Sequence, residues 1–211
     1  MRLTARGDVV FSSPMIRALR QAYPDARISW LGETHTIGLI EHHPELDQVF
    51  TWERNRWKEL FRKGKLLALS GEATAFIRAL QAERFDLAID MQGFLRSGLM
   101  SLVSGARTRV VLRPKEGSHY FADHVVDRYL TEANKEEICS HYRLLAKKLG
   151  LSTEDFRMEV PLHPDDRVYA GEIIKQKGIE NGNKPVKQQA RTMDMPGTDI
   201  LVDLPARHWH L

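Results

Sequence analysis

The sequence is nearly free of cysteine: Cys139 is the single one among 211 residues. An internal disulfide needs two cysteines, so none can form, and nothing points to an oxidising compartment. Histidines are paired at 42–43 and at 208 and 210, but no group of Cys and His has the spacing of a zinc site. We therefore expect a fold held by an ordinary apolar core, with no metal.

Long apolar runs and targeting signals are also absent. No segment approaches the roughly 18 apolar residues that a membrane-spanning helix needs, and the opening residues, MRLTARGD, are too polar for a signal peptide. We therefore expect a cytoplasmic location. The pI of about 9.0 favours anionic partners, but the basic stretch is short and no nucleic-acid motif accompanies it, so no nucleic-acid partner is expected.

What the first 150 residues do contain is an alternation of two hydrophobic patterns. Short apolar segments predict strands over 27–31, 48–52, 85–90 and 109–112, and amphipathic segments predict helices over 14–23, 34–42, 72–82, 95–103 and 136–149. Ser12 or Ser13 ahead of Pro14 predicts a helix N-cap. Strands alternating with helices predict an α/β fold, a Rossmann-like parallel sheet with helices on both faces. Ligands of such sheets bind beyond the carboxyl ends of the strands.

The two ends of the chain look different from this pattern. Residues 3–5 predict only the end of a first strand, shorter than the roughly five residues usual for a strand. Residues 182–198 are polar and rich in turn-forming residues, and 199–202 predict one more short strand. We predict a Rossmann-like acceptor-side domain over 1–163, a helix and polar linker over 164–198, and the first part of a second domain over 199–211.

The first candidate for chemistry is Asp8, which we predict to lie with Gly7 in the turn after the first strand. A carboxylate in such a turn can act as a general base toward a sugar hydroxyl. It can also cap the following helix, and position alone favours the cap.

The second candidate is the segment Asp90–Ser97, which follows the most apolar strand and opens a helix. Gly93 permits a tight turn, and backbone N–H groups there can bind an anion. The alternative is an ordinary loop in which Asp90 accepts local hydrogen bonds. The G-x-G-x-x-G fingerprint of dinucleotide-binding folds is absent from the first strand–helix turn.

Two basic segments complete the candidates. Residues 52–65 carry six cationic side chains against two anionic ones, with Trp57, Leu60 and Phe61 at helical spacing. Such a helix can lie on an anionic membrane surface or hold acceptor phosphates. It can also be a solvated helix whose aromatics pack on their own domain. The loop 113–119 can contact an anionic acceptor or simply be solvated.

These segments, taken in order, resemble the lipopolysaccharide heptosyltransferases, glycosyltransferase family nine. The matching blocks are 2–10, 14–19, 23–26, 28–31 with 43–47, and 85–93 with 96–99. The order of the blocks is more specific than any one motif. The resemblance implies the N-terminal half of a GT-B fold, in which two Rossmann-like domains face each other across a cleft and the N-terminal one holds the acceptor.

The resemblance also implies an inverting, metal-independent and cofactor-free transfer of heptose from ADP-heptose to the Kdo–lipid A inner core. The acceptor is lipid-linked and anionic, so peripheral contact with the inner membrane is implied as well. The family's proposed base falls on Asp8, and Arg96 stands where many relatives carry Lys. The predicted acceptor-binding residues are Arg6, Arg54, Arg56, Gln92, Gly93, Arg96 and Lys115.

The family normally continues through a whole second domain that holds the donor, whereas here that domain is at most 200–211. We therefore expect a transferase that is impaired or inactive as this chain. The alternative is a non-catalytic domain that binds anionic membrane or lipopolysaccharide through Arg54, Arg56, Lys58 and Arg62. An epimerase of the GT-B type is disfavoured, because the chain lacks the glycine fingerprint and a catalytic His in a matching loop.

Overall fold

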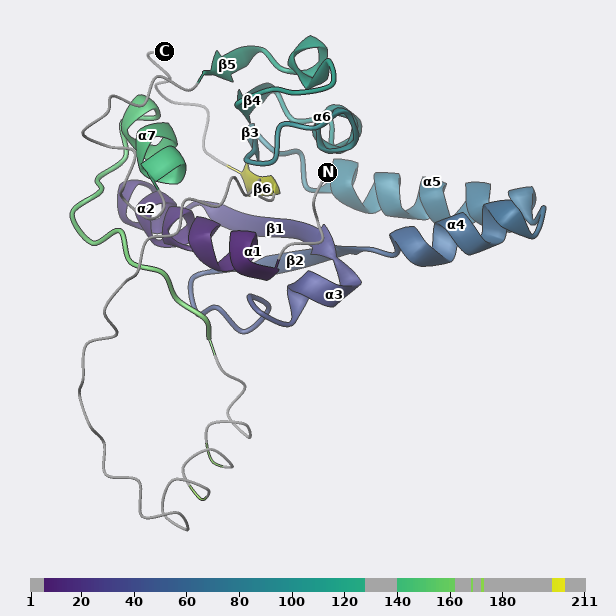
Figure 1. The fold of residues 1–211 in the computed structure, drawn as a ribbon, viewed down its shortest axis with the longest axis horizontal. Coiled ribbons are helices and arrows are strands. Elements are labelled where there is room, and N and C mark those ends of the chain that lie inside the picture. The colour runs from purple at the N-terminus through teal and green to yellow at the C-terminus, as the bar shows by residue number, and fades with distance from the viewer. Residues whose placement is uncertain (1–5, 128–139, 162–167, 169–171, 173–198, 204–211) are drawn as a thin grey trace.

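The computed structural model describes residues 6–127, 140–161, 168, 172 and 199–203 (Figure 1). Helices and strands alternate along the chain, as predicted. The helices are α1 (Arg6–Ser12), α2 (Pro14–Ala22), α3 (Thr34–Ile37), α4 (Arg54–Arg62), α5 (Leu66–Ala82), α6 (Leu95–Val103), α7 (Ser140–Lys148) and the 3-10 helix η1 (Ser118–Phe121). The strands are β1 (Arg27–Glu33), β2 (Gln48–Trp52), β3 (Leu87–Asp90), β4 (Thr108–Leu112), β5 (His124–Val126) and β6 (Asp199–Asp203).

The six strands form one sheet in the order β2-β1-β6-β3-β4-β5. β1 and β2 are parallel, as are β3, β4 and β5. β6 runs antiparallel to both β1 and β3, so those two strands point the same way. The carboxyl ends of β1 to β5 therefore lie along one edge of the sheet, which confirms the predicted α/β fold. We call this the ligand-binding edge, because ligands of such sheets bind there.

The strand predicted over 199–202 is present, but not where we expected it. Instead of lying apart from the first sheet, β6 fills its middle, where Ile200 is paired with Trp30 of β1 on one side and with Ile89 of β3 on the other. In a doubly wound sheet this place belongs to the first parallel strand. The residues predicted for that strand, 3–5, lie outside the described residues. So do all residues of the predicted helix and polar linker over 164–198 except 168 and 172.

The apolar side chains of the strands alternate between two core layers, one on each face of the sheet. On β1, Trp30 belongs to the layer covered by α2 and α7, and its neighbour Leu31 to the layer covered by α5 and α6. On β3, Ile89 and Ala88 are divided in the same way. Figure 1 shows the two groups of helices on opposite sides of the strands. This is the period-two pattern of a strand buried on both faces.

The start of the chain departs from the prediction. Residues 6–12 form a helix, α1, rather than the turn expected around Gly7 and Asp8. Because α1 runs directly into α2, Ser13 has a helical backbone and makes no side-chain cap bond. Its hydroxyl donates instead to the carbonyl of Val10 at 2.8 Å, a bond that serine often makes within helices. Ser13 therefore holds the predicted N-cap position ahead of Pro14, but its side chain does not cap the helix.

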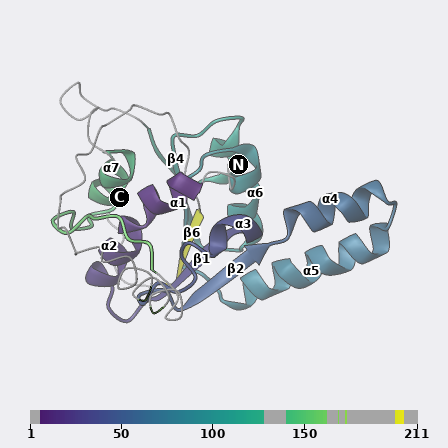
Figure 2. The same ribbon diagram turned by 60° about the horizontal axis from the view of Figure 1, so that its bottom comes forward.

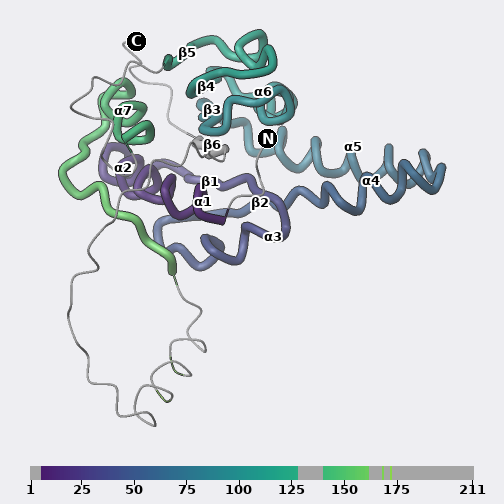
Figure 3. The backbone as a smooth tube through the Cα atoms, in the orientation of Figure 1, coloured from purple at the N-terminus to yellow at the C-terminus, as the bar shows by residue number. Residues whose placement is uncertain are grey.

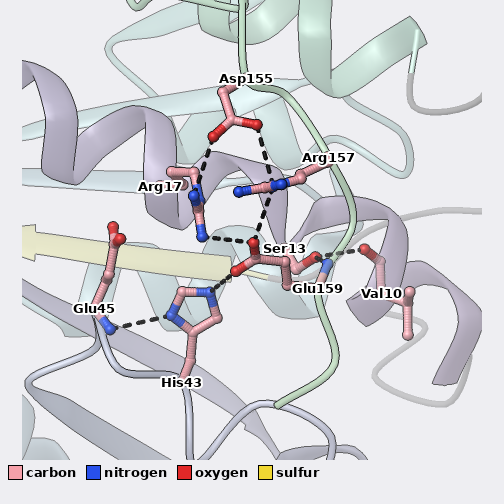
Figure 4. Close-up of polar contacts among 8 residues, drawn as sticks. All are labelled: Val10, Ser13, Arg17, His43, Glu45, Asp155, Arg157 and Glu159. Carbon is pink, nitrogen blue, oxygen red and sulfur yellow. Dashed lines mark hydrogen bonds and ion pairs between the residues drawn. The ribbon is translucent and has the colours of Figure 1, made fainter.

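A network of charged side chains fastens residues 155–159 to α2 (Figure 4). Arg17 of α2 contacts Asp155 at 3.0 Å and Glu159 at 2.5 Å, and Arg157 lies between the same two carboxylates at 3.1 and 3.3 Å. The backbone N–H of Glu159 donates to the Ser13 hydroxyl at 2.9 Å. These contacts join segments far apart in the sequence, and both carboxylates raise the pKa of Arg17.

His43 lies buried beside this network. Its Nδ1 accepts a hydrogen bond from the backbone N–H of Glu45 at 3.2 Å, so in the neutral ring the proton is on Nε2, which lies 3.5 Å from Glu159 Oε2. Burial lowers the pKa of His43, and the nearby Arg17 lowers it further, while Glu159 and Glu45 oppose the shift. The folded state therefore favours the neutral ring.

We predict that replacing Leu201 in β6 with proline lowers the stability of the whole domain. Proline has no N–H, and a strand paired on both sides has no position that tolerates the loss. The expected cost is at least about 1–3 kcal/mol for the missing hydrogen bond. Leu201→Val keeps the N–H and is the control. Thermal unfolding by circular dichroism should show a lower midpoint for the proline variant alone; equal midpoints would contradict the central place of β6.

We predict that His43 makes the protein less stable in mild acid. Because its folded pKa lies below the ordinary value of 6.5, the unfolded state binds more protons below that pH, so stability is lost as the pH falls. In His43→Asn the fall in melting temperature between about pH 8 and about pH 5 should be smaller than in the wild type. His42→Asn, at the exposed neighbour, should keep the wild-type dependence. If the melting temperature of His43→Asn depends on pH as that of the wild type does, His43 is not the group that destabilises the protein in acid.

Candidate functional site

The carboxyl end of β3 is built around Asp90, a buried carboxylate that accepts three hydrogen bonds. One oxygen accepts from the backbone N–H groups of Gln92 and Gly93, both at 2.8 Å. The other accepts from the hydroxyl of Ser97 in the first turn of α6 at 2.8 Å. Asp90 therefore shapes the turn, as the structural alternative in the sequence predicted. It also occupies the N–H groups of Gln92 and Gly93 that would otherwise face an anion.

Gly93 allows this turn to approach the neighbouring loop. Its backbone has a φ of +71°, and a Cβ at this position would lie 2.5 Å from the carbonyl oxygen of Leu112 and 2.6 Å from that of Arg113. The positive φ and the absence of space both favour glycine. The predicted importance of Gly93 thus has a structural cause: it lets the loops after β3 and β4 touch.

The loop after β4 is hydrogen-bonded to the same glycine. The backbone N–H of Lys115 and the hydroxyl of Ser118 both donate to the Gly93 carbonyl, at 2.5 and 2.6 Å. The Lys115 ammonium lies 5.5 Å from the centre of the Phe94 ring, a cation–π contact. Two predicted site segments, 90–97 and 113–119, therefore form one unit, and the side chain of Lys115 is exposed on it.

Gln92 brings a buried amide to this unit. The side chain is almost inaccessible, and neither its Oε1 nor its Nε2 has a hydrogen-bond partner among the described residues. Buried polar groups in proteins nearly always have a partner, so an amide of this kind marks a place where a ligand or water completes the bonding. This observation agrees with the predicted binding role of Gln92.

Asp8 is the third residue of α1 and is fully buried. The first turn of a helix favours a carboxylate, because the backbone N–H groups there carry partial positive charge. α1 packs against α3, which follows the carboxyl end of β1, so Asp8 belongs to an element at the ligand-binding edge. Arg6, two residues earlier, has an exposed side chain.

The predicted acceptor-binding arginines of α4 are engaged in ion pairs. Arg54 lies 3.4 Å from Glu33 at the end of β1. Arg56 binds Glu72 of α5 through both of its carboxylate oxygens, at 2.6 to 3.0 Å, and this contact raises the pKa of Arg56. An anionic acceptor would have to compete with these carboxylates. Arg96, on α6, has an exposed side chain.

Glu33 is a site residue that the sequence reasoning did not select. Its side chain is buried at the carboxyl end of β1, with Arg54 on one oxygen at 3.4 Å and His35 Nδ1 3.6 Å from the other. Its position in the sequence could have identified it as a site residue, because Glu33 follows Gly32 at the end of a predicted strand. Ser118 was missed for another reason, because its bond to Gly93 depends on a contact between two loops.

The edge thus holds buried carboxylates, exposed cations and one buried amide. A carboxylate can accept a proton from a hydroxyl, and the cations and amide can bind an anionic sugar. Within the described part of the chain, no group of three or more His, Cys, Asp or Glu side chains could hold a metal ion. The arrangement fits acid–base chemistry on a polar, negatively charged substrate.

Known proteins share both the sequence and the fold. The family model for glycosyltransferase family 9 (heptosyltransferase) matches residues 73–188, more than half of the chain. Lipopolysaccharide heptosyltransferase 1 of Escherichia coli K12 is 28% identical, across 99% of this chain and 61% of its own length. The lipopolysaccharide core heptosyltransferase OpsX of Haemophilus influenzae is 21% identical, across 82% of this chain and 46% of its own. The chain therefore spans about half to three fifths of these relatives.

Solved structures agree on the architecture. A family 9 glycosyltransferase from Veillonella parvula superimposes with a TM-score of 0.66 at 17% identity, over 84% of this chain and 48% of that one. E. coli heptosyltransferase WaaC, solved with ADP-2-deoxy-2-fluoro heptose, gives a TM-score of 0.60 at 21% identity, over 74% and 49%. At these identities the likeness shows a shared fold, here with about half of each neighbour.

We predict that Gly93→Ala separates the two loops of this edge and destabilises the protein. The left-handed backbone alone costs a residue with a Cβ about 1–3 kcal/mol, and the contacts with two carbonyl oxygens add to that. Gly71→Ala, in α5 where nothing lies within 4 Å, should instead stabilise by about 0.5–1 kcal/mol. Urea unfolding of both variants measures the difference. Equal stabilities would show that the loops do not need the close approach.

Proposed function

Because this chain belongs to glycosyltransferase family 9, the heptosyltransferase family, we propose that it is the acceptor-side half of a lipopolysaccharide heptosyltransferase. The proposed reaction transfers heptose from ADP-heptose to the Kdo–lipid A inner core with inversion and without a metal. The observation that carries this proposal is the family match over residues 73–188. That range includes the turn at Asp90–Ser97 and the loop with Lys115, which the structure joins through Gly93.

In this proposal Asp8 is the general base. Its carboxylate takes the proton from the acceptor hydroxyl as the oxygen attacks the anomeric carbon of the heptose, and ADP leaves with its bonding electron pair. The support is chemical: Asp8 is a buried carboxylate on an element packed beside the ligand-binding edge. Burial removes competing water, and a positioned carboxylate typically contributes about 10²–10⁴-fold to the rate of proton transfer.

Acceptor binding is assigned first to Lys115 and Gln92, and then to Arg96 and Arg6. The backbone N–H of Lys115 is hydrogen-bonded to Gly93 of the β3 turn, so the backbone of Lys115 is held in place. Its side chain is exposed to solvent. Gln92 offers a buried amide whose atoms find no partner among the described residues. Arg54 and Arg56 rank after Lys115 and Gln92, because Glu33 and Glu72 already neutralise them.

The donor half of the reaction is proposed to lie outside this chain. About half of each solved neighbour, including the protein crystallised with ADP-2-deoxy-2-fluoro heptose, has no counterpart in the 211 residues. In a GT-B enzyme two domains meet across the cleft, so binding of ADP-heptose needs contacts that one domain does not supply. We therefore propose that this chain binds acceptor and is impaired or inactive in transfer by itself.

We predict that the chain binds a delipidated, phosphorylated Kdo inner-core sugar and that Lys115→Ala weakens this binding about fivefold. The estimate corresponds to about 1 kcal/mol for one exposed charge contact. Isothermal titration calorimetry measures the affinities. Lys147→Ala, an exposed lysine of α7, is the control and should bind like the wild type. Equal weakening by both variants would show that the effect comes from net charge rather than from a contact of Lys115. If the wild type does not bind the sugar, the chain is not the acceptor-side half.

The same preparation tests the donor side. ADP-heptose should show no micromolar binding, and ADP release with acceptor present should stay at the level of the blank. Turnover by this chain alone would overturn the proposed absence of donor contacts. In that event Asp8→Asn decides the role of the base, since loss of the base should lower kcat by about 10²-fold or more while acceptor affinity stays unchanged.

A further inference from the structure

The hairpin formed by α4 and α5, residues 54–82, ends in a cluster of exposed apolar side chains. Phe61 is 68% exposed, Leu66 57% and Leu67 90%. All three lie at or beside the turn Lys63–Lys65, where Gly64 has a φ of +67°. Leucine and phenylalanine at such exposure are unfavourable in water, and three of them within seven residues make a local apolar tip.

These side chains are not needed to hold the hairpin together. Its two helices are joined nearer the sheet, where Trp57 packs edge-on against Phe76 of α5 with ring centres 5.7 Å apart. Trp57 also packs on Trp52 at the end of β2, at 5.8 Å, and Arg56 binds Glu72 across the helices. Each of the two alternatives that the sequence left open for these aromatic residues thus applies to a different part of α4. Trp57 packs on its own domain, whereas Phe61 faces solvent.

Cations surround the apolar tip. Lys58, Arg62, Lys63 and Lys65 are exposed, and between residues 58 and 71 the one carboxylate is Glu59, which pairs with Lys63. Of the cations that the sequence suggested for a membrane contact, Lys58 and Arg62 lie exposed close to the tip. Arg54 and Arg56 are bound to carboxylates near the sheet, so the available positive charge lies at the far end of the hairpin.

The hairpin carries this tip away from the rest of the domain. Figures 1 and 2 show α4 and α5 side by side and extending beyond the sheet, and Figure 3 follows the backbone out along α4 and back along α5. A helix of 17 residues such as α5 is about 25 Å long. The tip can therefore touch a flat surface without interference from the body. None of the described helices is long and apolar enough to cross a bilayer.

We infer that residues 61–67 dock on an anionic lipid bilayer. Phe61, Leu66 and Leu67 enter the headgroup region, where apolar side chains leave water, and Arg62, Lys63 and Lys65 lie at the level of the lipid phosphates. Each cation near such a surface raises the partition coefficient roughly fivefold. A protein partner would satisfy the apolar side chains equally well, but it would not by itself explain the exposed cations next to them.

The docking would also orient the candidate site. α4 begins directly after the carboxyl end of β2, so the hairpin rises from the same sheet edge as the turn at Gly93 and the loop with Lys115. A tip held in the bilayer keeps this edge close to the membrane. This second consequence rests on the proposed function, whose acceptor is a lipid, whereas the membrane contact itself does not.

The test is co-sedimentation of the 211-residue chain with vesicles that contain no lipopolysaccharide. Vesicles of phosphatidylcholine with phosphatidylglycerol should bind the chain, and pure phosphatidylcholine should bind it at least tenfold more weakly. The triple variant Phe61→Ser, Leu66→Ser, Leu67→Ser should lose at least tenfold in partition coefficient on the anionic vesicles. The variant Arg62→Ser, Lys63→Ser, Lys65→Ser should lose the preference for phosphatidylglycerol, and raised salt should have the same effect on the wild type.

Leu99→Ser with Leu102→Ser is the matched control, because these α6 leucines are also exposed but lie outside the hairpin. Melting temperatures of all variants should match the wild type, since the changed side chains are exposed. The inference is overturned if the wild type does not bind anionic vesicles, if the tip variants bind as well as the wild type, or if the control loses as much. A dimer in analytical ultracentrifugation that the apolar tip variant abolishes would overturn it as well, in favour of a second copy as the occupant.

Discussion

Backbone hydrogen bonds to one short strand join the two halves of the sheet. β2 and β1 form one parallel pair and β3, β4 and β5 another parallel set, and each set is paired with β6 rather than with the other. The site depends on this bridge. It sets the distance and direction between β1, which ends at Glu33, and β3, which ends at Asp90. If β6 were absent from its place, the loop that carries Arg54 would no longer share an edge with the loops that carry Gln92 and Lys115.

The sequence predicted most of the local structure, because local patterns determine it. The apolar run before Asp90 and the helix over 95–103 were found within a few residues of their observed bounds. Two errors have a common cause, which is competition between distant segments. Residues 6–12 fold as a helix rather than a turn, and 199–203 pair inside the first sheet. The hydrophobic pattern of either segment does not indicate which other segment it will contact in the fold.

The sequence predicted which residues lie at the candidate site. It did not predict which of them are engaged in ion pairs. Glycine at 93 and lysine at 115 were selected because they follow strands, and the structure gives the reason that they belong together, a shared hydrogen bond and a close backbone approach. The sequence did not indicate the pairing of Arg54 and Arg56 with carboxylates, since Glu33 lies 21 residues before Arg54 and Glu72 lies 16 residues after Arg56. For Asp8 the residue type and burial agree with a base, and its reactivity is still a prediction.

The central place of β6 has a consequence for the time course of biosynthesis. Its residues leave the ribosome more than a hundred positions after β3, which corresponds to on the order of ten seconds of translation. During that interval the hydrogen bonds of β6 to β1 and β3 cannot form, and unpaired strand edges are the kind of surface through which nascent chains aggregate. The domain is therefore expected to stay dependent on chaperones until its last described strand has been synthesised, and a premature stop before residue 199 would remove the strand that pairs with both β1 and β3.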